Sequence, residues 1–371
     1  MSASALLAAC LTTVAGLLVA GTAQADTIIG VAGPMTGSFA IFGQQMSQGA
    51  AQSIDDINRA GGVSGSPLVL QAVDDQCDAK TADAVANQLA GKGAAIVVGH
   101  LCLGASLAAS SVYYSNHIVE ISPGTTWPDY TDRRPGDGIY RLAGRDDQQG
   151  VVAGQASAQR FPDKAVAVVD DRSTYGKGLA DATRVAMNAA GKREAFTEEY
   201  DPGQRDFTGL VERLKAANIG VLYIGGYPPE AALIARQIRA AGLDTVIMGP
   251  DTLITKDYAD AAGDAADGTL VTFTPDARQN PGAADVVAAF RAKNIEPEAY
   301  VLPSYAAVQV WAEAAKTAGS TAYDAVVKAM DAGHFTTVLG DLTFNAKGDM
   351  SLPGFVLYRW HDGRLSYADA K

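Results

Sequence analysis

The stretch that decides the fold is AVAVVDDRSTYGKGLADATRVAMNAA, residues 165–190. It opens with a continuous apolar run, 165–169, which predicts a strand buried on both faces. Residues 174–190 follow with helical periodicity, and Gly191 after them is a helix stop signal. A buried strand followed directly by a helix is the repeating unit of parallel α/β folds.

The same alternation extends along the chain in both directions. We predict strands at 27–32, 68–73, 95–98, 118–121, 165–169, 221–224, 246–248 and 270–273, and a last one at 355–360. We predict helices at 42–58, 79–92, 103–114, 148–160, 174–190, 206–217, 229–241, 283–293, 303–318 and 323–332. Asp206 is expected to N-cap the helix at 206–217, and Gly242 is expected to end the helix at 229–241. The pattern predicts doubly wound parallel sheets.

The units fall into two successive runs, 26–143 and 144–274, and the remainder from Pro275 adds further helices. A chain of 371 residues exceeds the size at which one core stops growing, so we expect two lobes. No long Gly/Ser or Pro linker separates the runs. Several short crossings between the lobes explain this better than two domains in tandem.

Residues 1–25 are typical of a signal peptide, with an apolar run and an A-x-A cleavage site at 23–25. We therefore expect a periplasmic protein. A membrane anchor is the alternative, but the run is short for a span. Residues 7–10 resemble a lipoprotein box, yet cleavage there would leave an apolar stretch beside the lipid, so we do not expect lipid anchoring at Cys10.

The net charge of −12, without a basic run, argues against nucleic acid as a partner.

Two cysteines remain beyond the leader, Cys77 and Cys102, each shortly after a predicted strand. An even pair in a secreted chain predicts a disulfide. Free thiols are the alternative if the leader is not a signal.

Signatures of catalysis are missing from the sequence. There is no dinucleotide-binding, phosphate-loop or nucleophile-elbow motif in its context. The histidines lack metal-ligand spacing; they are His100, His117, His334 and His361. We therefore expect a binder without cofactor or metal, not an enzyme.

The segments that follow the strands hold the candidate ligand groups, since ligands of α/β folds bind beyond the carboxyl ends of strands. Residues 103–106 and 124–126 offer helix-start amides and hydroxyls suited to a carboxylate. Asp251 suits an ammonium. Phe42, Tyr175 and Tyr227 suit the walls. From spacing alone, ordinary half-buried packing is the alternative for the two tyrosines, and a helix N-cap is the alternative for Asp251.

Seven phrases, in this order, resemble the periplasmic leucine/isoleucine/valine-binding proteins, the type I solute-binding components of ABC importers. They are DDQCD (74–78), GHLC (99–102), SPGTT (122–126), YGKGLA (175–180), YIGGY (223–227), MGPD (248–251) and LTFNAKGD (342–349). The resemblance implies a type I periplasmic binding protein fold whose two lobes are joined by three hinge crossings. The lobes would be 26–143 plus 275–350 and 144–274 plus 351–371.

The resemblance also implies a Cys77–Cys102 bond, a ligand in a cleft that closes between the lobes, and a membrane ABC permease as partner of a monomer. It places Gly124 and Thr126 on the ligand's carboxylate and amine. The full candidate set is Phe42, Leu103, Gly104, Gly124, Thr125, Thr126, Tyr175, Tyr227, Asp251 and Tyr300.

Some of these positions depart from the family pattern. Leu103 stands where a serine is common, Phe42 where a tyrosine is common, and Asp251 where a glutamate is usual. Trp127 adds bulk beside the Thr126 loop. We expect an amino acid ligand, branched-chain or another small or aliphatic one. An aromatic or other carboxylate without an amine, or a sensory module that reports to a receptor, stays open.

Overall fold

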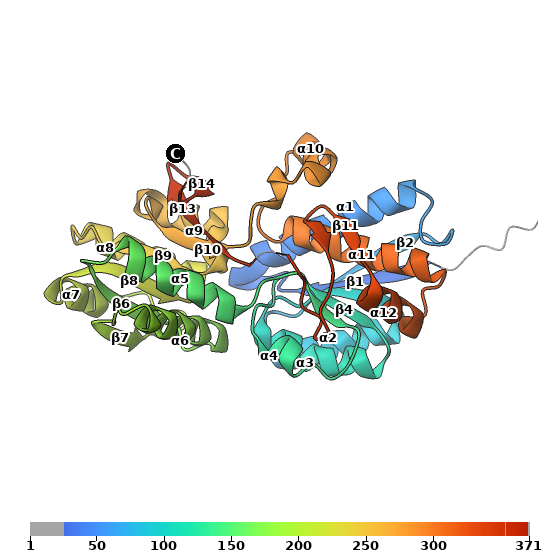
Figure 1. Cartoon of the computed structure of the whole chain (residues 1–371), viewed down its shortest axis with the longest axis horizontal. Helices are drawn as coiled ribbons and strands as arrows, with labels where there is room; N and C mark the ends of the chain where they lie inside the picture. The colour runs from blue at the N-terminus through green and yellow to red at the C-terminus, as the bar shows by residue number, and fades with distance from the viewer. Residues whose placement is uncertain (1–25, 353, 370–371) are drawn as a thin grey trace, which may run out of the picture.

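The computed structural model describes residues 26–352 and 354–369. The predicted leader, 1–25, with Cys10, lies outside the described residues. Figure 1 shows two α/β lobes side by side, joined at their centre.

The first lobe is built on a five-stranded parallel sheet in the order β2-β1-β3-β4-β5. Its strands are β1 (Thr27–Gly33), β2 (Leu68–Asp74), β3 (Ala94–Gly99), β4 (Val119–Ser122) and β5 (Ile139–Arg141). Its main helices are α1 (Ala40–Arg59), α2 (Ala79–Gly91), α3 (Leu103–Ser115), α11 (Val301–Ala318) and α12 (Tyr323–Ala332). Gly49 lets α1 approach α11, because a Cβ there would lie 2.0 Å from the Val301 carbonyl oxygen.

The second lobe is built on a seven-stranded sheet in the order β14-β13-β10-β9-β8-β6-β7. Its strands are β6 (Ala165–Asp170), β7 (Phe196–Glu199), β8 (Ile219–Gly225), β9 (Val246–Gly249), β10 (Leu270–Phe273), β13 (Val356–His361) and β14 (Arg364–Tyr367). Its helices are α5 (Asp146–Arg160), α6 (Thr174–Ala189), α7 (Thr208–Ala216), α8 (Pro228–Ala240) and α9 (Lys256–Ala262). Strands β6 to β10 pair in parallel, whereas β13 joins β10 antiparallel.

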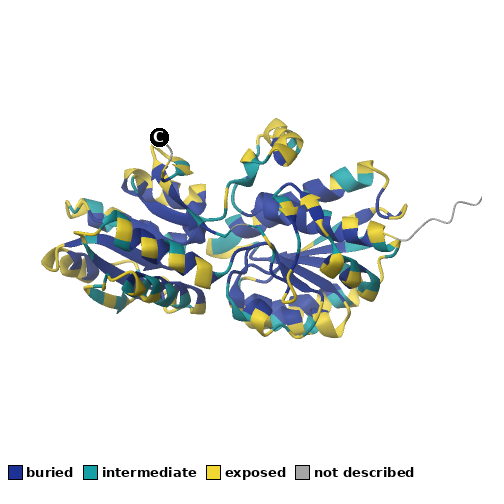
Figure 2. Cartoon of the chain, viewed as in Figure 1, coloured by how far each residue is buried: buried dark blue, intermediate teal, exposed yellow. Residues whose placement is uncertain are grey.

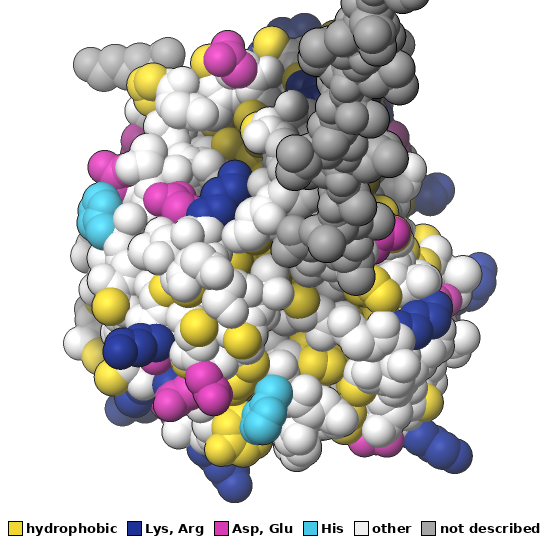
Figure 3. All heavy atoms as spheres, turned by 90° about the vertical axis from the view of Figure 1, so that its right-hand side faces the viewer, with side chains coloured by type: hydrophobic (Ala, Val, Ile, Leu, Met, Phe, Trp, Pro, Cys, Tyr) yellow, Lys and Arg dark blue, Asp and Glu magenta, His cyan; other side chains and the backbone are white. Residues whose placement is uncertain are grey.

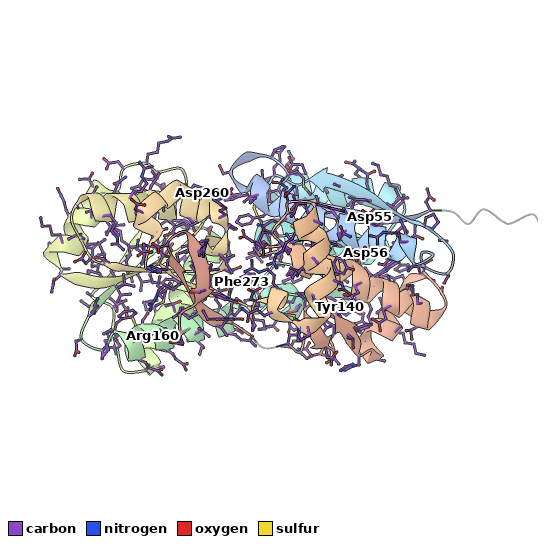
Figure 4. The ribbon with its side chains drawn as sticks, turned by 90° about the horizontal axis from the view of Figure 1, so that it is seen from above. Asp55, Asp56, Tyr140, Arg160, Asp260 and Phe273 are labelled. Atoms are coloured by element: carbon purple, nitrogen blue, oxygen red, sulfur yellow. A yellow bond between two sulfur atoms is a disulfide. The ribbon has the colours of Figure 1, made fainter. Side chains whose placement is uncertain are left out.

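The chain crosses between the sheets three times, after β5, after β10 and before β13. The second crossing leads to α10 (Ala284–Ala292), which lies above the junction in Figure 1. Phe273, the last residue of β10, lies at that junction in Figure 4, between Arg160 and Asp260 of one lobe and Asp55 and Tyr140 of the other. The predicted boundaries at 143, 274 and 350 stay predictions.

The predicted elements are present with end shifts of a few residues, and the structure adds several that the sequence pattern did not reveal. The additions are α4 (Asp129–Asp132), α9, β5, β7, β11 (Phe335–Thr337), β12 (Gly340–Leu342) and β14. These segments are short, and those in β7 and β14 are partly exposed, so they lack an apolar run. The predicted cap at Asp206 is wrong in detail: α7 begins at Thr208 with Phe207 as N-cap, although Asp206 still accepts the Thr208 amide at 2.9 Å.

Both sheets are buried between their helices, whose outer faces are exposed (Figure 2). Apolar side chains pack into separate clusters in the two lobes, around Trp311 in the first and around Trp360 in the second. On the end of the first lobe shown in Figure 3, outside the grey atoms, acidic and basic side chains are interspersed. Among the described residues, no helix combines the length and the apolar character needed to cross a membrane.

Candidate functional site

The lobes enclose a small cavity of about 20 Å³ between the carboxyl ends of their parallel strands. It is lined by Leu101, Leu103, Gly124, Thr125, Thr126 and Trp127 from the first lobe, by Tyr175, Tyr227, Asp251 and Thr252 from the second, and by Tyr300 ahead of α11. A space of this size holds about one water molecule. A larger ligand therefore requires the lobes or these side chains to move apart.

The loop after β4 forms one wall, and its own side chains hold it in shape. The Ser122 hydroxyl accepts the Thr125 amide at 2.8 Å and donates to the His100 carbonyl at 2.6 Å. The Thr125 hydroxyl lies 2.6 Å from that of Ser106 on α3. Ser122 and Thr125 thus position the loop, and Gly124, Thr125 and Thr126 all line the cavity.

The start of α3 forms the neighbouring wall, and a disulfide fixes it. Cys102 is the residue before α3 and is bonded to Cys77, with the two Cα atoms 5.4 Å apart. The helix has no side-chain cap, so its first amides are available to an anion. Beneath this turn the buried His100 ring lies 2.6 Å from an Asp75 oxygen and 2.9 Å from the Tyr113 hydroxyl.

Asp251 is the charged centre of the opposite wall. It follows β9, opens the 3-10 turn η2 (Asp251–Ile254), and is only 2% exposed. Its carboxylate accepts hydrogen bonds from the hydroxyls of Tyr175 at 2.5 Å and Tyr300 at 2.8 Å, and from Gln149 Nε2 at 3.0 Å. Burial raises the pKa of Asp251, and these three donors oppose the rise. The side chain caps no helix.

Aromatic rings close the cavity toward solvent. The Tyr227 ring lies 5.2 Å from that of Tyr175 and 4.6 Å from that of Phe39, which belongs to the other lobe. Leu103, Tyr175 and Tyr227 line both the inner cavity and an outer groove of about 590 Å³ between the lobes. These three side chains separate the cavity from the groove.

A tryptophan also bridges the lobes. The ring of Trp127, in the loop after β4, covers Gly178 on α6 so closely that a Cβ there would lie 2.0 Å from the ring. Glycine at 178 is therefore what permits the lobes to approach at this point.

Most of the candidate residues named from the sequence meet at the cavity. Phe42 does not: it is fully buried beneath Tyr300, with ring centroids 5.6 Å apart. Gly104 lines the outer groove instead of the inner cavity. Their roles toward a ligand, like those of the other candidates, stay predictions.

Sequence reasoning missed Gln149 and Phe39. Gln149 lies within a predicted helix and carries no distinguishing pattern, because its partner Asp251 is 102 residues away. Phe39 lies in a one-turn helix, η1 (Gly37–Phe39), in a segment that we did not assign. Its contact with Tyr227 arises only when the lobes meet.

A second cavity, of about 240 Å³, lies at the hinge among the crossing segments. Phe273, Pro275, Leu302 and Leu352 are among its apolar lining residues. Its charged residues include Asp276 and Arg278, which are paired with each other at 2.8 Å. The cleft cavity is the better candidate site, because a buried carboxylate and three tyrosines converge on it.

Comparison with known proteins matches the family model described as "Periplasmic binding protein" to residues 27–364. The "Leu/Ile/Val-binding protein homolog 1" of Brucella melitensis is 45% identical over 351 residues, which are 94% of each chain.

Solved structures of similar shape include a branched-chain amino acid transporter substrate binding protein from Streptococcus pneumoniae in complex with isoleucine. It has a TM-score of 0.84 and 24% identity and covers 92% of this chain and 98% of its own. A solute binding protein of an ABC transporter from R. palustris, in complex with benzoate, has a TM-score of 0.82 and 19% identity. It covers 93% of this chain and 96% of its own. Because both structures are less than 25% identical to this chain, their likeness shows the fold alone.

Proposed function

The chain belongs to the periplasmic binding protein family, and on this premise we propose that it captures an amino acid in its interlobe cleft for an ABC importer. Membership makes it a binding protein, not an enzyme, and implies a place outside the cytoplasm. The further steps, which concern the ligand, the residues that hold it and the transporter partner, are parts of the proposal.

The observation that carries the proposal is the polarity of the cleft. One wall presents a buried carboxylate, Asp251, and the other presents helix-start amides at Leu103 with the Thr126 hydroxyl nearby. An α-amino acid has the complementary pair, an ammonium and a carboxylate. The ammonium would pair with Asp251, and the carboxylate would take the amides and the hydroxyl.

The hydrogen bonds at Asp251 suggest how the cleft exchanges its contacts for a ligand. Tyr300 comes from the first lobe, so its bond to Asp251 connects the lobes directly. An arriving ammonium offers up to three donors and replaces such hydroxyl donors. Hinge opening admits the ligand, and closure brings Tyr175 and Tyr227 over it and excludes water.

The relative from Brucella supports an amino acid, because its printed name is that of a Leu/Ile/Val-binding protein homologue at 45% identity. The side chain of the ligand would contact Leu101, Leu103 and Trp127. Leu103 and Trp127 add bulk, which favours a small or aliphatic side chain.

We also propose a periplasmic monomer that hands its ligand to a membrane ABC permease and does not bind nucleic acid. The Cys77–Cys102 bond supports an oxidising compartment.

Isothermal calorimetry with the twenty standard L-amino acids, and with benzoate, tests the proposal. We expect at least one amino acid to bind and benzoate not to, since benzoate has no cation for Asp251. Asp251→Ala should weaken amino acid binding roughly 30-fold or more, which corresponds to about 2 kcal/mol for removing a buried charge partner. Asp260→Ala is the matched control: Asp260 lies on α9 with an exposed side chain that is paired with Lys256, and it does not line the cleft cavity. Absence of any amino acid binding refutes the proposal.

A further inference from the structure

The hinge cavity of about 240 Å³ has no role in the function proposed for the cleft. An apolar cavity of about 150 Å³ is sufficient to admit a benzene-sized molecule. The hinge cavity therefore has room for an aromatic ring with a short chain. Most of its lining residues are apolar, which suits such a body.

The walls of the hinge cavity come from both lobes. Leu302 on α11 and Leu339 before β12 belong to the first lobe, and Ile254 on η2 and Leu365 on β14 belong to the second. The crossing segments supply further lining residues between them, namely Thr274, Pro275, Asp276, Ala277, Arg278 and Pro297. Because the walls belong to parts that move relative to one another at a hinge, the shape of the cavity depends on how the lobes are arranged.

The hinge cavity also borders the contact that joins the lobes in the cleft. Phe273 lines the hinge cavity, lies at the junction in Figure 4, and packs its ring edge-on against Tyr300 with the centroids 6.1 Å apart. Tyr300 in turn donates to Asp251 across the cleft at 2.8 Å. A molecule that fills the hinge cavity thus supports the side chains that make this bond.

One carboxylate of the lining is available to a ligand. Asp276 is paired with Arg278 at 2.8 Å, and Arg278 is paired with Glu296 at 2.9 Å. The Tyr358 hydroxyl donates to the Thr274 carbonyl at 2.9 Å. Glu298 differs, because no donor in residues 26–352 and 354–369 forms a hydrogen bond with its side chain. Burial raises the pKa of Glu298, and the charge of Arg278 opposes the rise.

We propose that the hinge cavity is a second ligand site, which takes a small molecule with an apolar body and an ammonium group that pairs with Glu298. The site is separate from the cleft cavity and does not depend on the ligand proposed for the cleft. Because its walls come from both lobes, a bound molecule favours the arrangement described here over one with the lobes apart.

NMR titration with 2-phenylethylamine and with 2-phenylethanol tests the proposal, because the two probes have nearly the same shape and differ in charge. We expect the amine to bind. The alcohol should bind about fivefold more weakly or worse, since it cannot form a charge-assisted pair with Glu298.

Two variants locate the probe. Glu298→Gln keeps the shape of the side chain and should weaken the amine about fivefold while leaving the alcohol unchanged, a difference that misfolding would not produce. Leu365→Trp replaces a half-buried lining residue with a larger one and should abolish binding of both probes. Glu313→Gln is the matched control for charge: Glu313 is exposed on α11 and does not line the cavity, so its variant should bind both probes as before.

A third variant tests the dependence on the lobes. Gly178→Val should wedge Trp127 away from α6, part the walls of the hinge cavity, and weaken the amine about fivefold or more. Unchanged affinity in this variant contradicts the dependence on the lobe arrangement.

The site and the ligand class fail separately. Unchanged amine affinity in Leu365→Trp overturns the hinge cavity as the site. Equal affinity for the amine and the alcohol, or unchanged amine affinity in Glu298→Gln, overturns the pairing with Glu298. Neither result bears on amino acid binding in the cleft, which the calorimetry above tests on its own.

Discussion

Removing the Cys77–Cys102 bond tests how far the wall of the cleft depends on a covalent link. The bond closes a loop with a sequence separation of 25 residues, and its Cα atoms are 5.4 Å apart, a usual disulfide spacing. On the chain-entropy relation, a loop of this length removes about 12 cal/mol/K from the unfolded chain. At 25 °C the bond therefore stabilises the fold by about 3.5 kcal/mol. Cys77→Ala/Cys102→Ala should lower the free energy of unfolding by this amount.

Urea titration followed by tryptophan fluorescence measures the effect, and the chain offers a reporter in each lobe. Trp311 is fully buried in the first lobe and Trp360 is 3% exposed in the second. With Trp127→Phe and one further Trp→Phe change, each remaining tryptophan follows one lobe. We expect the loss in the transition of Trp311, since both cysteines belong to that lobe.

Reductant provides the matched control. It should destabilise the unaltered protein as much as the double substitution does, and should leave the double variant unchanged. A loss below about 1 kcal/mol at Trp311 would refute the chain-entropy reasoning for this loop.

Three further predictions concern the walls of the cleft and the contacts between lobes. Asp349→Asn should lower the free energy of unfolding at pH 7 by about 3–5 kcal/mol, because it leaves Arg141, fully buried and 2.7 Å from Asp349, without its charge partner. Gly124→Ala should reduce amino acid affinity tenfold or more in calorimetry, since the new Cβ would lie 2.4 Å from Leu101 and 2.8 Å from the Tyr300 ring. Gly178→Val should wedge Trp127 away from α6 and hold the lobes apart, which small-angle scattering would detect as a larger radius of gyration when ligand is added.

Each of these has its own check. Although burial opposes it, the Thr131 hydrogen bond and the charge of Arg141 keep the pKa of Asp349 below its usual value. A lowered carboxyl pKa contributes stability above the unfolded pKa of about 3.9, which is lost as the pH falls through the folded pKa. The unaltered protein should therefore lose more stability below pH 4 than Asp349→Asn, and equal losses would contradict this.

Gly91→Ala on α2, where a Cβ meets nothing within 4 Å, is the control for both glycine variants and should bind and close normally.

The sheet strands show what sequence reasoning captures and what it does not. The run at 165–169 was sufficient to predict β6, because a strand buried on both faces needs a continuous apolar segment. β7, with the sequence FTEE, gave no such signal, because it is held by pairing with β6 at the edge of the sheet and alternates between half-buried and exposed positions. The antiparallel pairing of β13 with β10 likewise depends on a crossing that no local pattern reveals.

For the cleft, the loops after the strands could be named from the sequence because their position in an α/β fold is set by the strands themselves. Phe42 was assigned to the cavity, and the structure instead buries it beneath Tyr300. A helical residue is oriented by the packing of its neighbours, and residue type alone does not show whether it faces a cavity or the core.

By itself, then, the sequence determined the alternation of strand and helix, the division into two runs of such units, and the disulfide pair, because each depends on nearby residues or on composition. Only the tertiary structure decided that Asp251 would share its hydrogen bonds among Tyr175, Gln149 and Tyr300. These residues are far apart in the chain, and the surroundings of a carboxylate are set by which distant segments exclude water from it. That exclusion exists only once the lobes have folded and met.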